Sequence, residues 1–139
     1  MANYKQIYMR YMDDNGIKYS EVQGRENVVK VVYTGDNLNS IPVFVFFDKD
    51  GEGMVTLKCW DIANFKGNKL AAGLIACNDM NDKYRWVKFY VDKDGDIIAQ
   101  IDAYIDERTC GYECASLVRR VVNITDEAYP TFMKALWSK

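Results

Sequence analysis

Two runs of alternating apolar residues, joined by a tight turn, constrain the fold of this chain more than any other feature. Val87, Phe89 and Val91 alternate with more polar residues before the turn, and apolar residues alternate from Ile97 to Ile105 after it. Asp92-Lys93-Asp94-Gly95 lies between them and is typical of a hairpin turn. Since successive residues of a strand point to opposite faces, this segment predicts an antiparallel hairpin with one face on the core.

A second hairpin is predicted earlier in the chain. Residues 41–47 are apolar on both faces, which indicates a central strand covered on both sides. Asp48-Lys49-Asp50-Gly51 predicts the turn, and residues 55–59 supply the return strand. Residues 27–34 alternate as a further strand, and residues 17–23 are a weaker candidate.

Helical spacing of apolar residues recurs outside these strands. It predicts helices over residues 2–14, 66–81 and 114–121. We expect Asn123-Ile124-Thr125 to break the third of these, with Thr125 capping a short last helix that has Pro130 in its first turn.

Together these segments predict an α+β fold with one antiparallel sheet of five to six strands flanked by helices. The predicted order is α-β-β-β-(β)-α-β-β-α-α. The chain has 139 residues and no linker-like stretch, so a single domain over residues 1–139 is expected.

The absence of histidine is the most useful negative feature of the composition. It removes Ser-His-Asp and Cys-His catalysis, histidine metal sites and the usual general base near neutral pH. We therefore predict no catalytic residue, no cofactor and no metal, and expect a protein that is not an enzyme.

The charge pattern argues against nucleic acid and membranes as partners. The net charge is −2, and the basic residues are scattered, whereas both partners select a clustered basic face. The first residues lack the features of a signal peptide, and no apolar stretch approaches the roughly eighteen residues of a membrane span. These features predict a cytoplasmic protein whose four cysteines are free thiols.

Two groups of residues resemble metal sites but have simpler explanations. Cys110 and Cys114 lie one helical turn apart and either share a metal or redox role or act as small buried hydrophobes, which is the commoner case. The acidic turns resemble calcium loops, but Cys59 occupies the twelfth position of a loop that begins at Asp48, where a glutamate is needed. Hairpin turns account for them better.

One face of the second hairpin has an unusual composition. Trp86, Lys88 and Tyr90 alternate on one strand, opposite polar and aromatic residues of the next. This mixture is typical of a protein-binding surface, unless the last helices cover it. Trp137, near the chain end, either docks on the sheet or contacts a partner.

The stretch from Asn78 to Asp102 resembles the YbjN family, which is labelled as bacterial sensory transduction regulators. The resemblance rests on Asn78-Asp79-Met80-Asn81, on Trp86-Val87-Lys88-Phe89-Tyr90, on Asp92–Ile97 and on the downstream Tyr129-Pro130. It implies a fold like that of type III secretion chaperones, often paired as homodimers, and it implies no catalytic residue.

By analogy with those chaperones, Leu74, Ile75 and the Trp86/Tyr90 face are candidate interface residues. We therefore expect a non-enzymatic protein-binding module, either chaperone-like or a regulatory adaptor, that forms a homodimer and binds an unidentified protein partner. The alternative is a small-ligand sensor, or an enzyme that uses carboxylate, Lys and Tyr groups in a pocket.

Overall fold

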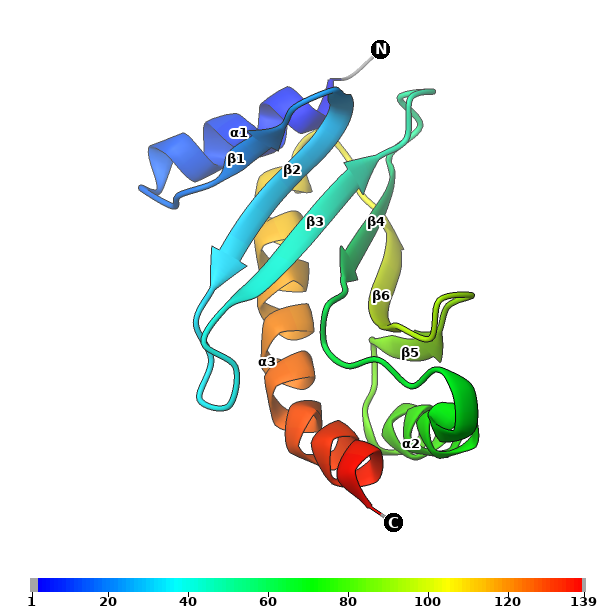
Figure 1. Ribbon diagram of the computed structural model, residues 1–139. Coiled ribbons are helices and arrows are strands. Elements are labelled where there is room, and N and C mark those ends of the chain that lie inside the picture. Colours follow the sequence, from blue (N-terminus) through cyan, green and yellow to red (C-terminus); the bar gives the residue numbers. More distant parts are fainter. Residues whose placement is uncertain (1–2, 139) are drawn as a thin grey trace.

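The structure, a computed structural model, describes residues 3–138 and is built around one six-stranded antiparallel sheet (Figure 1). The strand order is β1-β2-β3-β4-β6-β5. The elements are α1 (Tyr4–Asp14), β1 (Ser20–Val22), β2 (Arg25–Tyr33), β3 (Ile41–Phe47), β4 (Met54–Cys59), a short 3-10 helix (Gly67–Lys69), α2 (Leu70–Lys83), β5 (Lys88–Val91), β6 (Ile97–Tyr104) and α3 (Cys110–Trp137). The predicted α+β class and antiparallel sheet are confirmed. Residue 2, where the first helix was predicted to begin, lies outside the described residues.

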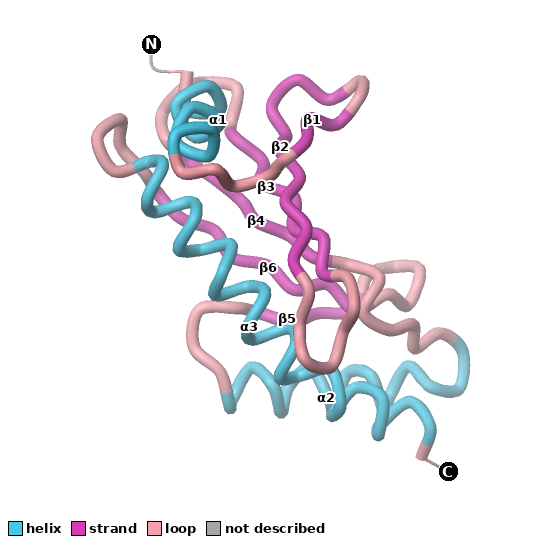
Figure 2. Tube along the Cα trace, turned by 90° about the vertical axis from the view of Figure 1, so that its left-hand side faces the viewer, coloured by secondary structure: helices cyan, strands magenta, loops and turns pink. Residues whose placement is uncertain are grey.

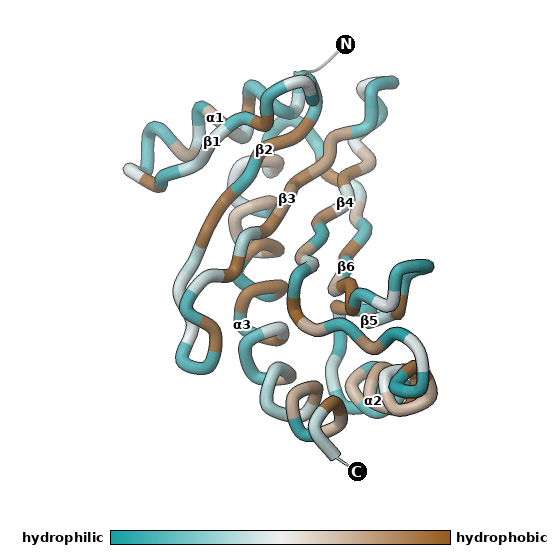
Figure 3. Tube along the Cα trace, in the orientation of Figure 1, coloured by the Kyte–Doolittle hydropathy of each residue, from teal (hydrophilic) through white to brown (hydrophobic). Residues whose placement is uncertain are grey.

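The core lies between the sheet and helices α1 and α3, which cover one of its faces (Figure 2). Ile41, Val43 and Val45 of β3 point into this core and are fully buried. Hydrophobic residues concentrate along β2, β3 and the middle of α3, whereas the turn after β5 is hydrophilic (Figure 3). No helix in the described part of the chain covers the opposite face of the sheet, where Phe44 and Phe46 are only half-buried. The prediction that β3 is covered on both faces is therefore wrong, although β3 lies inside the sheet.

The last helix is continuous, so the predicted break at Asn123-Ile124-Thr125 is wrong. Thr125 continues the buried stripe of α3 rather than starting a new helix. Pro130 lies inside the helix, where its missing N–H leaves the carbonyl of Asp126 without its usual donor. The side-chain amide of Asn37 donates to that carbonyl over 3.0 Å and replaces the missing hydrogen bond.

The carboxylate of Asp126 fixes the loop between β2 and β3. It accepts hydrogen bonds of 2.9 Å from the backbone amides of Asp36, Asn37 and Leu38. A Cβ on Gly35 would fall 2.2 Å from this carboxylate, so only glycine allows the close approach. Desolvation raises the pKa of Asp126, but the three amide hydrogen bonds outweigh it and hold that pKa below its usual value.

A side chain of α2 forms hydrogen bonds with the outer edge of strand β5. The amide of Asn81 donates to the carbonyl of Phe89 over 3.0 Å and accepts from its N–H over 2.7 Å. These two bonds satisfy backbone groups that would otherwise be open to another strand.

Candidate interaction surface

The uncovered side of the sheet, called here the open sheet face, consists of the residues that alternate with the core positions. Strand register places them in rows that run across the sheet. One row is Val28, Phe46, Thr56 and Asp102, and the next is Lys30, Phe44, Lys58, Gln100 and Lys88. The antiparallel pairing therefore gathers aromatic and cationic side chains from distant parts of the chain.

Three aromatic rings form the centre of this face. Trp60, which follows β4, stacks on Phe44 with ring centroids 4.3 Å apart and planes 9° apart. The centroid of Phe46 lies 6.4 Å from that of Trp60 at a tilt of 34°. No helix of the described residues lies over this aromatic cluster.

Three cations surround the aromatic cluster. The Lys30 ammonium lies 5.7 Å from the ring centroid of Phe44. The Arg25 guanidinium and the Lys58 ammonium lie 5.6 and 5.9 Å from the centroid of Phe46. Within residues 3–138 none of these cations forms a salt bridge, so each is available to an incoming anion.

A shallow depression of about 460 Å³ lies between the aromatic cluster and the turn after β5. Arg25, Lys58, Tyr90, Asp92 and Asp96 are among the residues that line it. The hydroxyl of Tyr90 donates to the side-chain carbonyl of Gln100 over 2.7 Å, which fixes the ring on this face. Burial, together with the nearby carboxylates of Asp102 and Asp92, raises the pKa of Tyr90.

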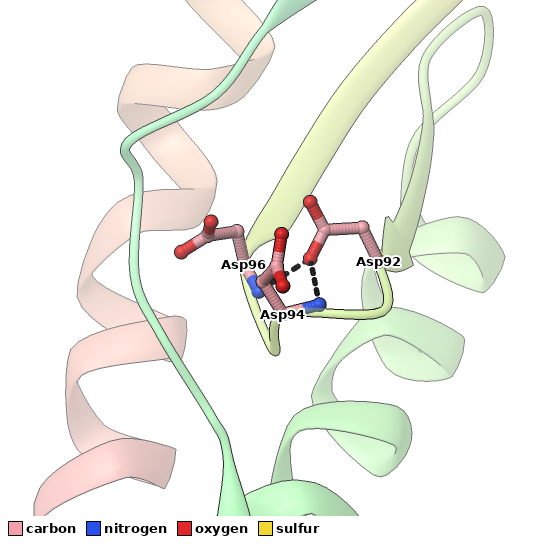
Figure 4. A group of neighbouring side chains, drawn as sticks. All are labelled: Asp92, Asp94 and Asp96. Atoms are coloured by element: carbon pink, nitrogen blue, oxygen red, sulfur yellow. Dashed lines mark hydrogen bonds between the residues drawn. The ribbon is translucent and has the colours of Figure 1, made fainter.

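The acidic turn after β5 is a hairpin turn, as predicted (Figure 4). Oδ1 of Asp92 accepts hydrogen bonds of 2.9 Å from the backbone amides of Asp94 and Asp96. Asn64 donates to the carboxylate of Asp96 over 2.8 Å. One oxygen from each aspartate lies within 4.8 Å of the others, so this group could hold a cation. The hydrogen bonds within the turn already account for the positions of Asp92 and Asp96.

The four cysteines are buried and free. Burial raises the pKa of Cys59 to about 12 and that of Cys77 to about 11. The pKa of Cys114 is raised by its hydrogen bond with Cys110 and by burial. Because the thiolate is the nucleophile and the metal ligand, these environments favour the interpretation of the cysteines as small hydrophobic side chains.

The structure separates the predicted interface residues. Tyr90 lies on the open sheet face, but Trp86 precedes β5 and its ring packs against Arg120 of α3. A shared Trp86/Tyr90 face is therefore wrong, and α1 and α3 cover the face of the sheet opposite to Tyr90. Leu74 and Ile75 are exposed on α2.

Trp137 is exposed near the end of α3. A hydrogen bond of 2.7 Å from Lys69 Nζ to the carbonyl of Ser138 brings this end close to the start of α2. Trp137 therefore lies near the helix that carries Leu74 and Ile75, whereas Tyr90 and Trp86 lie elsewhere.

Sequence reasoning missed the aromatic cluster. Phe44 and Phe46 lie in an all-apolar run whose two faces look alike, and Trp60 follows a strand without any periodic signal. The available signal was that Lys30 and Lys58 occupy polar positions within alternating strands. In the observed register both cations lie opposite Phe44.

Comparisons with known proteins agree with this architecture. The family profile described as "YbjN: Putative bacterial sensory transduction regulator" matches residues 9–134. No curated protein matches the sequence significantly. The helices found between residues 3 and 138 include none with the length and apolar character needed to cross a membrane.

A solved structure has a similar fold. The crystal structure of YbjN, "a putative transcription regulator from E. coli", superimposes with a TM-score of 0.61 at 10% sequence identity. The match covers 88% of this chain and 89% of that chain. At this identity the similarity concerns the fold alone. Because the family profile spans all but the ends of the sequence, the chain belongs to the YbjN family.

Proposed function

We propose that this chain is a non-enzymatic regulatory protein that binds an acidic segment of a partner protein on the open sheet face. It acts there as a chaperone-like protein or an adaptor. The observation that carries the proposal is the aromatic cluster of Phe44, Phe46 and Trp60, which no described helix covers. Aromatic side chains with an adjacent arginine are typical of the energetic centres of protein interfaces.

The charges on this face favour an acidic protein over a nucleic acid. Arg25, Lys30 and Lys58 have no carboxylate partner within the described residues and lie beside apolar rings. A partner segment with both apolar and acidic side chains packs on the rings and pairs with the cations at the same time. A nucleic acid selects an extended cluster of basic residues, whereas the basic residues of this chain are scattered and this face carries three cations around its rings.

The regulatory part of the proposal is supported by the family description. The non-enzymatic part is supported by the absence of histidine and by the raised pKa values of Cys59, Cys77 and Cys114. We also propose one domain over residues 1–139, a cytoplasmic location and a homodimer. Sedimentation equilibrium of the purified chain from 1 to about 100 μM tests the dimer.

The experiment uses the wild type and two double variants of equal net charge as baits for proteins in a bacterial cell extract. Lys30→Glu/Lys58→Glu reverses two cations of the open sheet face. Lys18→Glu/Lys134→Glu reverses two exposed lysines elsewhere. The expected result is a protein retained by the wild type and the control but not by the first variant, with affinity for the purified partner reduced at least about tenfold. Equal retention by all three baits, or retention of nucleic acid instead, would contradict the proposal.

A small-ligand sensor is the second candidate, because the depression of about 460 Å³ lies on the same face. Its lining combines the rings of Phe46 and Trp60 with both charge signs. This function predicts that an anionic metabolite raises the melting temperature of the wild type but not of Lys58→Gln, with Lys18→Gln as the control. If no metabolite in an anionic panel does so, the protein-binding function is favoured.

A further inference from the structure

The outer edge of β6 is unpaired along its last residues. β5 pairs with β6 only as far as Gln100, although β6 continues to Tyr104. Backbone groups of alternate residues point to opposite edges of a strand, and the N–H of Ile105 donates to the carbonyl of Gly53 on the β4 side. The N–H and carbonyl groups of Asp102 and Tyr104 therefore point to the open edge, and within residues 3–138 none of them has a hydrogen-bond partner. Four such groups in a row form a template for another strand.

A strained turn at Trp86 takes the chain away from this edge just before β5. The φ of Trp86 is +79°, and the N–H of Val87 donates to the carbonyl of Arg85 over 2.9 Å, which closes a three-residue γ-turn around the tryptophan. The left-handed form of this turn is rare and strained, and a bulky side chain increases the strain. Such strain persists where the surrounding structure imposes it, and it is concentrated at binding sites.

A groove of about 300 Å³ lies beside the open edge and is called here the Trp86 groove. The residues that line it include Trp86, Ala103, Tyr104, Glu113, Leu117 and Arg120. The first belongs to the turn, the next two to β6 and the last three to α3. The groove therefore lies between the open edge and α3. Because the side chain of Ala103 is small, a strand paired with the edge has room for a side chain that points toward α3.

The start of β5 and the charge beside it select what can occupy the open edge. β5 begins at Lys88, opposite Gln100. A strand laid along the open residues therefore has to end or turn at that point. The Arg120 guanidinium lies there, 4.6 Å from the ring centroid of Trp86, and within residues 3–138 it forms no salt bridge. A strand antiparallel to β6 brings its carboxyl end to this cation, whereas a parallel strand would bring its positively charged amino end.

A chain end fits this edge better than a second copy of the chain does. If two β6 edges paired through both open residues, Asp106 of one copy would lie opposite Gln100 of the other, a place that Lys88 already occupies. We propose that the open edge of β6 binds the C-terminal segment of a partner protein as an added antiparallel strand, with the terminal carboxylate against Arg120. The backbone hydrogen bonds of such a strand provide affinity, and the groove beside it provides sequence preference.

The Trp86 groove also sets the spacing of side chains in the bound segment. When its last residue pairs with Asp102, the residue two positions earlier pairs with Tyr104, and all four open backbone groups gain partners. The residues one and three positions before the end then point toward α3, the first of them toward Leu117. Glu113 lies two helical turns before Arg120, a distance of about 10 Å or about three residues of strand. An apolar residue next to the end and a lysine three positions before it are therefore expected.

The full chain, labelled with ¹⁵N, tests this proposal by nuclear magnetic resonance. The probe is the peptide acetyl-Ser-Ser-Lys-Val-Leu-Val with a free carboxyl end. It is compared with its C-terminal amide and with a version methylated on the backbone nitrogen of the first Val, the residue that pairs with Tyr104. The expected result is a saturable shift of the Trp86 indole signal and slower hydrogen exchange of the Asp102 and Tyr104 amides, while the Trp60 indole signal stays in place. The methylated peptide should bind at least about fivefold more weakly, because it lacks one strand hydrogen bond.

Two variants with the same change in charge test the role of Arg120. Wild-type protein is expected to prefer the free acid over the amide by about threefold to fivefold, as an exposed ion pair allows. Arg120→Gln loses this preference, and Arg119→Gln, at the exposed neighbouring position on α3, keeps it. Both variants are first checked for a wild-type-like spectrum.

Four results would overturn the proposal. The first is no saturable shift of the Trp86 signal at millimolar peptide. The second is equal binding of the methylated peptide, which removes strand addition. The third is a shift of Trp60 instead, which places the peptide on the open sheet face. The fourth is protection of the Asp102 and Tyr104 amides that rises with protein concentration in the absence of peptide, which gives the edge to a second copy. Since Trp60 reports on the open sheet face separately, failure here leaves the function proposed for that face untouched.

Discussion

Gly73 of α2 lies directly against Phe65, and a Cβ added to the glycine would fall 2.6 Å from the Cβ of Phe65. Phe65 is fully buried and contacts the ring of Phe132 on α3 with centroids 6.4 Å apart. Glycine weakens a helix, and its presence in α2 is explained by this close approach rather than by the local sequence.

Gly73→Ala is therefore expected to destabilise the protein although alanine favours helix. The gain in helix propensity is about 1 kcal/mol. Overpacking against Phe65 costs more, and the net loss of unfolding free energy is about 1–2 kcal/mol by urea titration. Asn78→Ala, at an exposed position of the same helix, is the control and should be neutral or stabilising. A Gly73→Ala protein more stable than wild type would show that Phe65 moves aside freely.

The strain at Trp86 predicts an inverted order of stability between two variants. Both Trp86→Gly and Trp86→Ala remove the ring, but only alanine retains a Cβ at φ +79°. A glycine variant is ordinarily less stable than the alanine variant at the same position. Here the unfolding free energy of Trp86→Gly should exceed that of Trp86→Ala by about 1 kcal/mol. Chemical denaturation of both variants decides the point, and the ordinary order would mean that the turn is unstrained.

Asp126→Asn should loosen the loop between β2 and β3. The neutral amide is a weaker acceptor for the backbone amides of Asp36, Asn37 and Leu38, and the expected loss is about 1–3 kcal/mol. Glu127→Gln, at the exposed neighbouring position, is the control and should change the unfolding free energy little.

The effect of Asp126 on stability depends on pH. The folded-state pKa of Asp126 is lowered, so its stabilising effect is complete above the unfolded value of about 3.9 and is lost as pH falls through the folded value. The gap in stability between wild type and Asp126→Asn should therefore be constant from pH 7 to 5 and narrow below about pH 4. A gap that widens on acidification would contradict this assignment.

Because no described helix covers the open sheet face, we expect its aromatic residues to stabilise the fold less than core aromatic residues do. A strand buried on both faces would make Phe44→Ala cost about 3–5 kcal/mol. Since Phe44 is half-buried and stacked on Trp60, a loss of about 1–2 kcal/mol is expected instead. Phe132→Ala, in the fully buried core, is the reference and should cost about 3–5 kcal/mol. Equal losses would mean that another part of the protein covers this face.

Local pattern was sufficient for the sheet and most of the helices. Residues 41–47 were predicted as a strand with the bounds that β3 has, and the alternation after Gly95 predicted β6 to within one residue. In β6 a period of two matches the buried side of the sheet, whereas β3 was recognised as an unbroken apolar run that ends at a turn.

The features that the sequence did not predict depend on long-range contacts or on local strain. Helix α3 continues past residue 125 because Asn37, far away in sequence, satisfies the carbonyl that Pro130 leaves free. Trp86 continued the alternation of the strand, and nothing in its residue type indicates a left-handed turn. The aromatic cluster required the register of β3 with β4, which alternation alone does not provide.

Folding of the last helix is expected to proceed in two stages. Turns of α3 before Asp126 need only local hydrogen bonds, whereas the segment from Pro130 onward depends on a bond to Asn37 across 89 residues of chain. Closing so long a loop costs chain entropy that only a formed sheet offsets. In pulse-labelling hydrogen exchange, amides between Thr131 and Trp137 should gain protection with the β2–β3 pairing, after those of the first turns. The helix α3 is thus continuous in the folded structure but consists of two cooperative units that form one after the other.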